Sequence, residues 1–250
     1  PGRLAPEARA FAAAMEDKAE SPERCFRNGP CLIGATEASG APDFLLWGDS
    51  HAAALEPAVS AMAARFGRKG VVLKAPGCVP AFDVWSSQET EECYKKRVLA
   101  SAYAAKADIG AVILVSRWIS KLEGKPGNRL APLLRDGQAQ GPPSPTTARA
   151  VLRRGLDRTV TAFDHQQQNI WLVRQAPVFF EALNSHKSFN HLVTRRHVAA
   201  WAPWLNAPEI RLRIPLADHR AWQAPADRIL DAVADRHGLG VIDPASALCD

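Results

Sequence analysis

The sequence predicts one α/β domain with a mainly parallel five-stranded sheet covered by helices on both faces, a three-layer arrangement. Three observations predict it. Short apolar runs recur along the chain, stretches of helical composition separate them, and 250 residues with 47% hydrophobic content suffice for one sizeable core. In sheets of this kind, functional sites gather at the carboxyl ends of the strands.

Two stretches are expected to lie outside the regular layers. Residues 1–40 precede the domain, with an Ala-rich helix at 6–20 and a lead-in loop at 21–40 that is dense in Gly, Pro and Cys. The α/β domain itself is placed at residues 41–250. Within it, residues 123–145 are rich in Gly and Pro, contain an Asp-Gly turn signal and predict a surface excursion or hairpin.

Five buried strands are expected within the domain, because an apolar run between turn-forming residues is typical of a strand covered on both faces. Such runs occupy residues 43–47, 71–73, 111–115, 170–173 and 240–243. Helical composition follows the first run at 51–66 and lies between the second and third at 91–106. A further helix is expected at 225–237, with Pro225 near its first turn and Gly238 at its end.

The composition favours a soluble protein that binds no nucleic acid. The net charge of +5 is modest and is spread along the sequence rather than gathered into a basic run. No stretch approaches the roughly 18 consecutive apolar residues of a membrane helix, and the amino terminus lacks the apolar core of a secretory signal. Because the chain opens with Pro rather than Met, we expect a processed segment, with any membrane or targeting part outside it.

Ser50 stands where a nucleophile stands in such a fold. It follows the first buried strand and opens a helix, so its hydroxyl can clear the sheet while the amino end of the helix favours developing negative charge. Gly48 permits the tight turn, and Asp49 and His51 point to opposite sides of the serine. The alternative is that Asp49 and Ser50 only cap the helix, as such residues most often do at these junctions.

The string Gly-Asp-Ser-His after an apolar strand resembles the first block of the SGNH, or GDSL-like, hydrolase superfamily. More narrowly, the chain resembles the SGNH domains fused to membrane acyltransferases of the acyltransferase-3 family, which acetylate bacterial surface polysaccharides. The likeness extends over most of the chain and rests on residues 25–31, 45–52, 75–80, 112–118 and 242–249. It implies an SGNH-hydrolase-like, flavodoxin-like fold.

The resemblance implies a role for Ser50 as the nucleophile that accepts the acyl group. Its own backbone N–H and the Gly77 loop are the implied oxyanion donors. The third block of the superfamily, Gly-x-Asn, is replaced by Ser-Arg-Trp at 116–118, where Arg117 either supplies a guanidinium to the site or forms an ordinary surface ion pair. The site-lining candidates are therefore Asp49, His51, Gly77, Ser116, Arg117 and Trp118.

The fourth block, an Asp-x-x-His that supplies the general base and its orienting carboxylate, is missing from the sequence. In the resembling domains it follows the segment that corresponds to residues 242–249 by a few tens of residues, so we expect it beyond Asp250. Asp243 matches the strand before that block and is not assigned to a triad. A chain without the block would be inactive.

The other histidines predict no metal site, because no pair has the spacing of a zinc-binding helix. We expect surface positions for His165, His186, His191, His197, His219 and His237. Residues 189–204 interleave His, Arg and Trp, which could line a sugar-binding cleft, although packing is the better explanation for Trp201 and Trp204. No cofactor and no metal are expected.

The cysteines predict two local disulfides. Cys25 and Cys31 frame a Gly-Pro turn, and Cys78 and Cys93 frame a second loop. Zinc is the competing explanation, but the sequence has no Cys-x-x-Cys pair. Two disulfides would indicate an oxidising compartment. Cys249 is left over, and we expect its partner beyond the end of the chain.

The resemblance implies a periplasmic O-acetyltransferase domain. It would move an acetyl group onto a surface glycan such as the lipopolysaccharide O-antigen, with an N-terminal integral-membrane acyltransferase-3 domain as acyl supplier and inner-membrane tether. A carbohydrate O-acetylesterase is the near alternative, because water and a sugar hydroxyl can capture the same acyl-enzyme. A glycan-binding or assembly module without catalysis is the alternative from another class.

Overall fold

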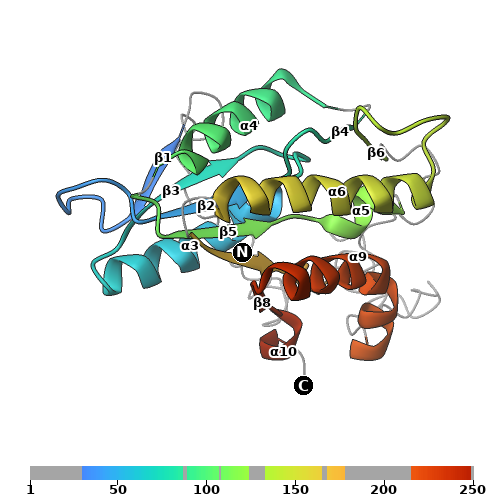
Figure 1. Ribbon diagram of the computed structural model, residues 1–250. Coiled ribbons are helices and arrows are strands. Elements are labelled where there is room, and N and C mark those ends of the chain that lie inside the picture. Colours follow the sequence, from blue (N-terminus) through green and yellow to red (C-terminus); the bar gives the residue numbers. More distant parts are fainter. Residues whose placement is uncertain are drawn as a thin grey trace, which may run out of the picture.

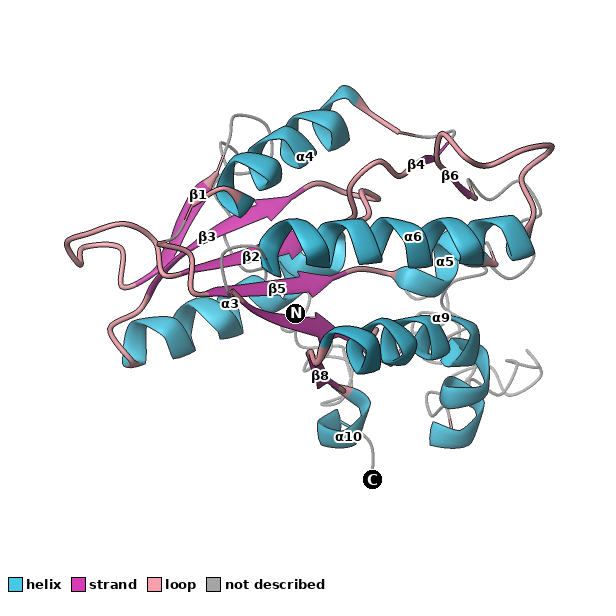
Figure 2. Cartoon of the chain, viewed as in Figure 1, coloured by secondary structure: helices cyan, strands magenta, loops and turns pink. Residues whose placement is uncertain are grey.

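The computed structural model of the chain describes residues 30–86, 89–106, 108–123, 133–164, 168–177 and 215–248. Figures 1 and 2 show these residues from one viewpoint. Several predicted features lie outside them, namely the helix at 6–20, the aromatic segment 189–204, Cys25, Cys249, His165, His186, His191 and His197.

A six-stranded sheet in the order β1-β3-β2-β5-β7-β8 forms the centre of the molecule. Its strands are β1 (Cys31–Gly34), β2 (Phe44–Gly48), β3 (Lys69–Lys74), β5 (Ala111–Val115), β7 (Asn169–Val173) and β8 (Gly240–Ile242). Strand β2 pairs in parallel with β3 and β5, and β5, β7 and β8 continue the parallel pairing. The predicted fold class and the five predicted strands are confirmed.

The sixth strand, β1, was not expected, because it falls inside the predicted lead-in loop. It pairs antiparallel with β3, with Cys31 opposite Val72 and Gly34 opposite Lys69. Only Ile33 in this strand is buried, and it packs against Ala63 and other residues of one core cluster. A four-residue edge strand with one buried side chain lacks the continuous apolar run by which the inner strands were recognised.

Helices cover both faces of the sheet, as the sequence predicted. Helix α3 (Ser50–Arg65) packs on one face, and α4 (Glu91–Ala104), α6 (Pro145–Asp164) and α9 (Leu216–His237) pack on the other (Figure 1). Because successive side chains of a strand point to opposite faces, Phe44 and Leu46 of β2 pack toward α3, whereas Leu45 and Trp47 join the core beneath α6 and α9. All five residues of β2 are buried, which explains its unbroken apolar run.

Two helices differ from the prediction. Helix α6 was not anticipated, although its buried side chains recur at helical spacing at Val151, Leu152, Leu156, Val160 and Phe163. Helix α9 begins at Leu216, so Pro225 lies in its interior rather than in its first turn. Its predicted end is confirmed, because Gly238 caps it with a left-handed φ of 65°.

Short elements complete the described structure. In the predicted excursion, β6 (Leu134–Arg135) pairs antiparallel with β4 (Trp85–Ser86). Helix α5 (Trp118–Leu122) follows β5, and α10 (Ala245–Leu248) follows β8. Across the described residues, no helix combines the length and the apolar character needed to cross a bilayer.

Candidate active site

Ser50 is the first residue of α3 and lies directly after the carboxyl end of β2, with only Asp49 between the two elements. The residue is exposed to solvent. Among the described residues, none forms a hydrogen bond with its hydroxyl. The arrowheads of β2, β3 and β5 point to the same edge in Figure 2, so the serine lies on the carboxyl rim of the sheet. Its position therefore leaves the oxygen accessible to an incoming carbonyl carbon.

Asp49, and not Ser50, caps the helix. Its Oδ1 accepts a hydrogen bond of 2.8 Å from the backbone N–H of His51, and Asp49 is the N-cap residue of α3. The capping interpretation of the sequence therefore holds for Asp49, and the nucleophile interpretation of Ser50 stays a prediction. Because the aspartate performs the capping, the serine hydroxyl is left out of the cap.

The second oxygen of Asp49 joins the ends of two neighbouring strands. Oδ2 accepts hydrogen bonds from the Ser116 hydroxyl at 2.8 Å and from the Arg117 backbone N–H at 2.9 Å. Asp49 is 2% exposed and Ser116 is fully buried. Parallel pairing places Gly48 opposite Val115, which brings the residues that follow each strand side by side. One buried carboxylate therefore fixes the serine turn relative to the turn after β5.

Gly48 is required for close approach and not for an unusual backbone angle. A Cβ atom at this position would lie 1.9 Å from the Val115 carbonyl oxygen and 3.0 Å from the Ala52 Cβ. The sequence assigned this glycine to a tight turn, but its φ is not positive. Its role is to let β2, β5 and the first turn of α3 meet beneath the serine.

The Gly77 loop flanks Ser50 on the side of β3. Gly77 has a φ of 74°, a left-handed conformation that favours glycine. The neighbouring Cys78 forms a disulfide with Cys93 of α4, as the sequence predicted, with a Cα–Cα distance of 5.3 Å. Cys31 is also disulfide-bonded, whereas its predicted partner Cys25 lies outside the described residues. The disulfide to α4 therefore restrains the loop that carries Gly77.

Arg117 flanks Ser50 on the opposite side, at the end of β5. Its side chain is half-buried, and its Nε and Nη2 atoms are buried without a hydrogen-bond partner in the described part of the chain. Burial lowers the pKa of this guanidinium and the nearby Asp49 raises it; an arginine remains charged across the working pH range. The site thus contains a cation with unused donors.

His51 provides an imidazole in the same turn. Burial lowers its pKa below the ordinary 6.5, Asp49 opposes that shift and the charge of Arg117 adds to it. At neutral pH the ring is therefore uncharged, and it cannot serve as a standing cation for an oxyanion.

Ser116 and Trp118 support the site from the interior instead of lining it. The Ser116 hydroxyl is used by Asp49, as described above. Trp118 is 1% exposed, and its indole N–H donates a hydrogen bond of 2.8 Å to the Val173 carbonyl at the end of β7. Of the three residues that replace the Gly-x-Asn block, Arg117 alone has buried donors that no described residue binds.

The sequence missed a polar cluster at the β7–β8 end of the same rim. His219, expected at the surface, is only 4% exposed because the first turns of α9 pack over the strand ends. It lines a cavity with Arg174 and Gln175, which follow β7, and Asp243, which follows β8. The position of these residues directly after predicted strands is a signal that could have identified them.

His237 and Asp243, two further polar residues that the structure describes, have hydrogen-bond partners. His237 is half-buried, and its Nε2 lies 3.2 Å from a carboxylate oxygen of Asp157. The Asp243 carboxylate accepts a hydrogen bond from the Ala245 N–H at the start of α10. Within the described ranges, no group of three or more His, Cys, Asp or Glu side chains could hold a metal ion.

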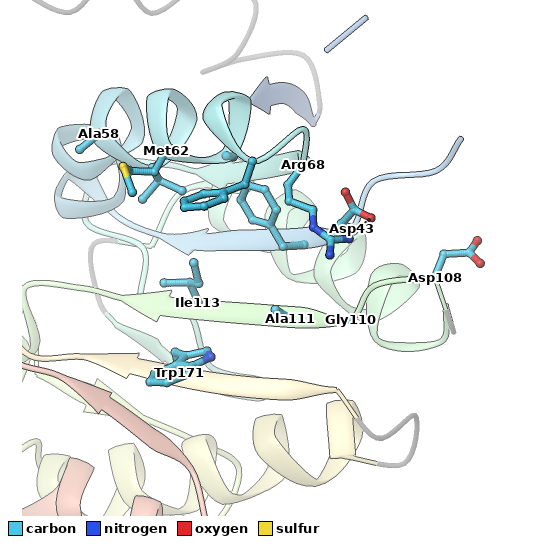
Figure 3. Close-up of a pocket in the computed structure, with 13 residues that line it drawn as sticks. Asp43, Ala58, Met62, Arg68, Asp108, Gly110, Ala111, Ile113 and Trp171 are labelled. Atoms are coloured by element: carbon cyan, nitrogen blue, oxygen red, sulfur yellow. Dashed lines mark ion pairs between the residues drawn. The ribbon is translucent and has the colours of Figure 1, made fainter. Parts of the chain in front are cut away.

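A larger cavity of about 660 Å³ lies away from Ser50, between α3 and the sheet (Figure 3). Met62 of α3 faces Ile113 of β5 and Trp171 of β7 across it. Asp43 and Arg68, whose side chains lie 3.5 Å apart, mark its end near the amino ends of the strands. Because its lining is mostly apolar and lies at the opposite ends of the strands, the chemistry is assigned to the carboxyl rim.

This fold, with an exposed serine at the carboxyl rim of a mainly parallel sheet, fits an α/β domain of the SGNH type, a class of esterases and acyltransferases. The chain belongs to the family of SGNH domains fused to AT3 domains, whose model matches residues 15–250. Among solved structures, it is similar to the periplasmic domain of a lipopolysaccharide acetyltransferase of Salmonella ser. Paratyphi A. That alignment has 14% identity and a TM-score of 0.48, and covers 85% of this chain and 70% of that chain. No curated protein matches the sequence.

Proposed function

We propose that this domain transfers an acetyl group onto a bacterial surface glycan, such as the lipopolysaccharide O-antigen, through an acyl-enzyme on Ser50. The observation that carries the proposal is the exposed hydroxyl of Ser50, which no described residue binds, at the first residue of a sixteen-residue helix. Membership of a family fused to AT3 domains supports an acyl supply from a membrane acyltransferase domain.

Each half of the reaction conserves its atoms and charges. The Ser50 oxygen attacks the acetyl carbonyl carbon, the donor departs with the bonding electrons, and the hydroxyl proton passes by way of a base to the departing donor, which leaves the base free for the second half. A sugar hydroxyl then attacks the serine ester, loses its proton to the same base and carries the acetyl group away, and Ser50 recovers a proton. The base is expected from the Asp-x-x-His block of the family.

The oxyanion of each tetrahedral intermediate is assigned to donors on both sides of Ser50. The backbone N–H of Ser50 at the helix amino terminus and the loop around Gly77 are two candidates. The Arg117 guanidinium is the third, because two of its nitrogens have no partner among the described residues. Removal of one such donor typically costs about 2.7–4 kcal/mol of transition-state stabilisation.

Hydrolysis of a carbohydrate O-acetyl ester is the second candidate function. The exposure of Ser50 favours it, because water can reach an acyl group held at this position. The Cys78–Cys93 disulfide and the disulfide-bonded Cys31 support an oxidising compartment for either activity. We assign the domain to the periplasm, next to the inner membrane that would hold its AT3 partner.

The test measures cleavage of 4-methylumbelliferyl acetate by the full-length protein, with and without a glycan acceptor. We expect acetylated glycan as the main product, and we expect Ser50→Ala to abolish it. Ser101→Ala is the matched control, because Ser101 is an exposed serine on α4. Hydrolysis that dominates with every acceptor would assign an esterase, whereas activity that survives Ser50→Ala would refute the serine mechanism.

A further inference from the structure

A cavity of about 200 Å³ lies at the β7–β8 end of the carboxyl rim. Residues between His219 and Asp231 of α9 form one wall, and residues that follow β7 and β8 form the other. Its polar lining includes Arg174, Gln175, His219, Asp227, Asp231 and Asp243. The cavity is smaller than the roughly 300–1,000 Å³ typical of pockets for drug-sized ligands, so it suits a single small polar unit.

Two deeply buried side chains in this cavity have unused hydrogen-bonding atoms. Gln175 is 1% exposed, and neither its Nε2 nor its Oε1 has a partner in the described part of the chain. His219 is 4% exposed, and its Nδ1 is likewise unpartnered there. Buried polar atoms are nearly always satisfied in native proteins, because each unsatisfied group costs about 1–3 kcal/mol. A donor- and acceptor-rich ligand in the cavity would satisfy them.

The charges around the cavity balance. The lining contains three aspartates, Asp227, Asp231 and Asp243, and three arginines, Arg174, Arg220 and Arg228. Nη2 of Arg174 lies 2.6 Å from Oδ1 of Asp231, and Nη1 of Arg174 lies 3.6 Å from Oδ2 of Asp243. Because the lining has as many aspartates as arginines, its formal charges sum to zero, and the cavity favours an uncharged ligand over an anion or a cation.

Asp227 adds a carboxyl group that can donate as well as accept a hydrogen bond. Burial raises its pKa to about 6; Arg174 opposes the shift, and Asp231 and Asp243 add to it. A carboxyl with this pKa is partly protonated near neutral pH, whereas an ordinary aspartate is fully ionised. Carboxyl, amide and guanidinium groups together supply the acceptors and donors that the hydroxyls of a sugar can bind.

The cavity lies on the same rim as Ser50. Ser50 follows β2 and Gln175 follows β7, and only β5 separates these two parallel strands. Two strand spacings of about 4.8 Å put the two sites roughly 10 Å apart along the rim. A short oligosaccharide can span this distance.

We propose that this cavity binds one neutral sugar unit of the acceptor glycan, adjacent to the unit whose hydroxyl attacks the acyl-serine. The proposal rests on the proposed acetyl transfer and adds a subsite that selects the acceptor. Gln175 and His219 would bind the sugar hydroxyls at the floor of the cavity, and Asp227 would bind them from α9.

Binding is tested without any acyl donor, so it does not depend on the chemistry of Ser50. Saturation-transfer NMR measures contact of the full-length protein with three neutral probes: the methyl glycosides of mannose, galactose and rhamnose. At least one should bind. Gln175→Ala and Asp227→Ala should each weaken it about tenfold, the equivalent of one lost hydrogen bond.

Two substitutions serve as matched controls. Gln138 is an exposed glutamine in the turn before α6, and Asp235 is an exposed aspartate on α9 outside the cavity. Gln138→Ala and Asp235→Ala should leave binding unchanged. The subsite is refuted if no neutral glycoside binds, if the cavity variants bind like the controls, or if methyl glucosaminide, a cationic sugar, binds more tightly than the neutral sugars. Sugar binding without Ser50-dependent transfer would refute the proposed function alone.

Discussion

The carboxylate of Asp49 accepts a hydrogen bond of 2.8 Å from the hydroxyl of Ser116, across 67 residues of sequence. Both residues are buried, and each follows the carboxyl end of a central strand. The same carboxylate also binds the backbone N–H groups of His51 and Arg117. One side chain therefore aligns the serine turn with the arginine on its flank.

Substitution of Asp49 by Asn should lower the free energy of unfolding by about 1.5–3 kcal/mol. The asparagine amide is uncharged, so its hydrogen bonds to the buried donors are weaker than those of a carboxylate. Its NH₂ group also replaces one acceptor oxygen and faces at least one of those donors, which leaves that donor without a partner. Urea denaturation measures the change. Asp235→Asn, at an exposed position, should stay within about 0.5 kcal/mol of the wild type. Equal stability of the two variants would contradict the alignment role of Asp49.

Gly48→Ala should destabilise the domain strongly. The new methyl group would lie 1.9 Å from the Val115 carbonyl oxygen, so β2 and β5 would have to separate. We expect the free energy of unfolding to fall by about 3 kcal/mol or more, because overpacking typically costs about 1–3 kcal/mol. Gly137→Ala is the control, because a Cβ atom at Gly137 would meet nothing within 4 Å. Thermal unfolding of both variants decides the point, and a normal melting temperature for Gly48→Ala would rule out the close contact.

Loss of the Cys78–Cys93 disulfide should cost about 3 kcal/mol, because the bond closes a loop between residues 15 apart in sequence. The double variant Cys78→Ala/Cys93→Ala isolates this bond. Its unfolding midpoint in urea should fall below that of the wild type under non-reducing conditions. Since Cys31 is also disulfide-bonded, a reductant tests both bonds together. A double variant as stable as the wild type would show that the loop is held by packing alone.

Asp227→Asn should stabilise the protein at pH 7 relative to the wild type, but not at pH 4. Folding raises the pKa of Asp227 from its ordinary 3.8 to about 6, chiefly by burial. The native state therefore holds this proton more tightly than the unfolded state, and the resulting stabilisation is lost as the pH rises through 6. Asparagine never ionises, so its advantage should grow between about pH 4 and pH 7.

Denaturation at a series of pH values measures this difference. Asp235→Asn provides the comparison, since it removes an exposed carboxyl from the same helix. A difference between Asp227→Asn and the wild type that stays constant from pH 4 to pH 7 would refute the raised pKa.

The inner strands were predictable because burial on both faces leaves an unbroken apolar run, as in β2. Strand β1 was not, since it lies at the edge and buries only Ile33. Helix α6 was overlooked behind a Gly- and Pro-rich stretch, even though Pro145 is a favourable first residue for a helix. The local sequence therefore identified the strands that are buried on both faces, but it did not identify the edge strand β1 or helix α6.

At the site, the sequence predicted which residues follow the ends of strands, but it did not predict which side chains those residues contact. Ser50, Gly77 and Arg117 follow predicted strands, and the structure places all three on one rim. That Asp49 binds Ser116, and that His219 is buried, depends on contacts between distant segments. Such contacts leave no periodic signal in the sequence.

The hydrogen bond between Asp49 and Ser116 can form only after both segments of the chain have been synthesised and their strands have paired. Parallel neighbours are joined by long crossover connections, so pairing of this kind forms slowly. On the ribosome, Ser50 and Asp49 emerge well before the turn after β5, whose Ser116 and Arg117 bind the Asp49 carboxylate. A nascent chain therefore carries the Ser50 turn without these hydrogen bonds until residues 116 and 117 have been synthesised and β5 has paired with β2.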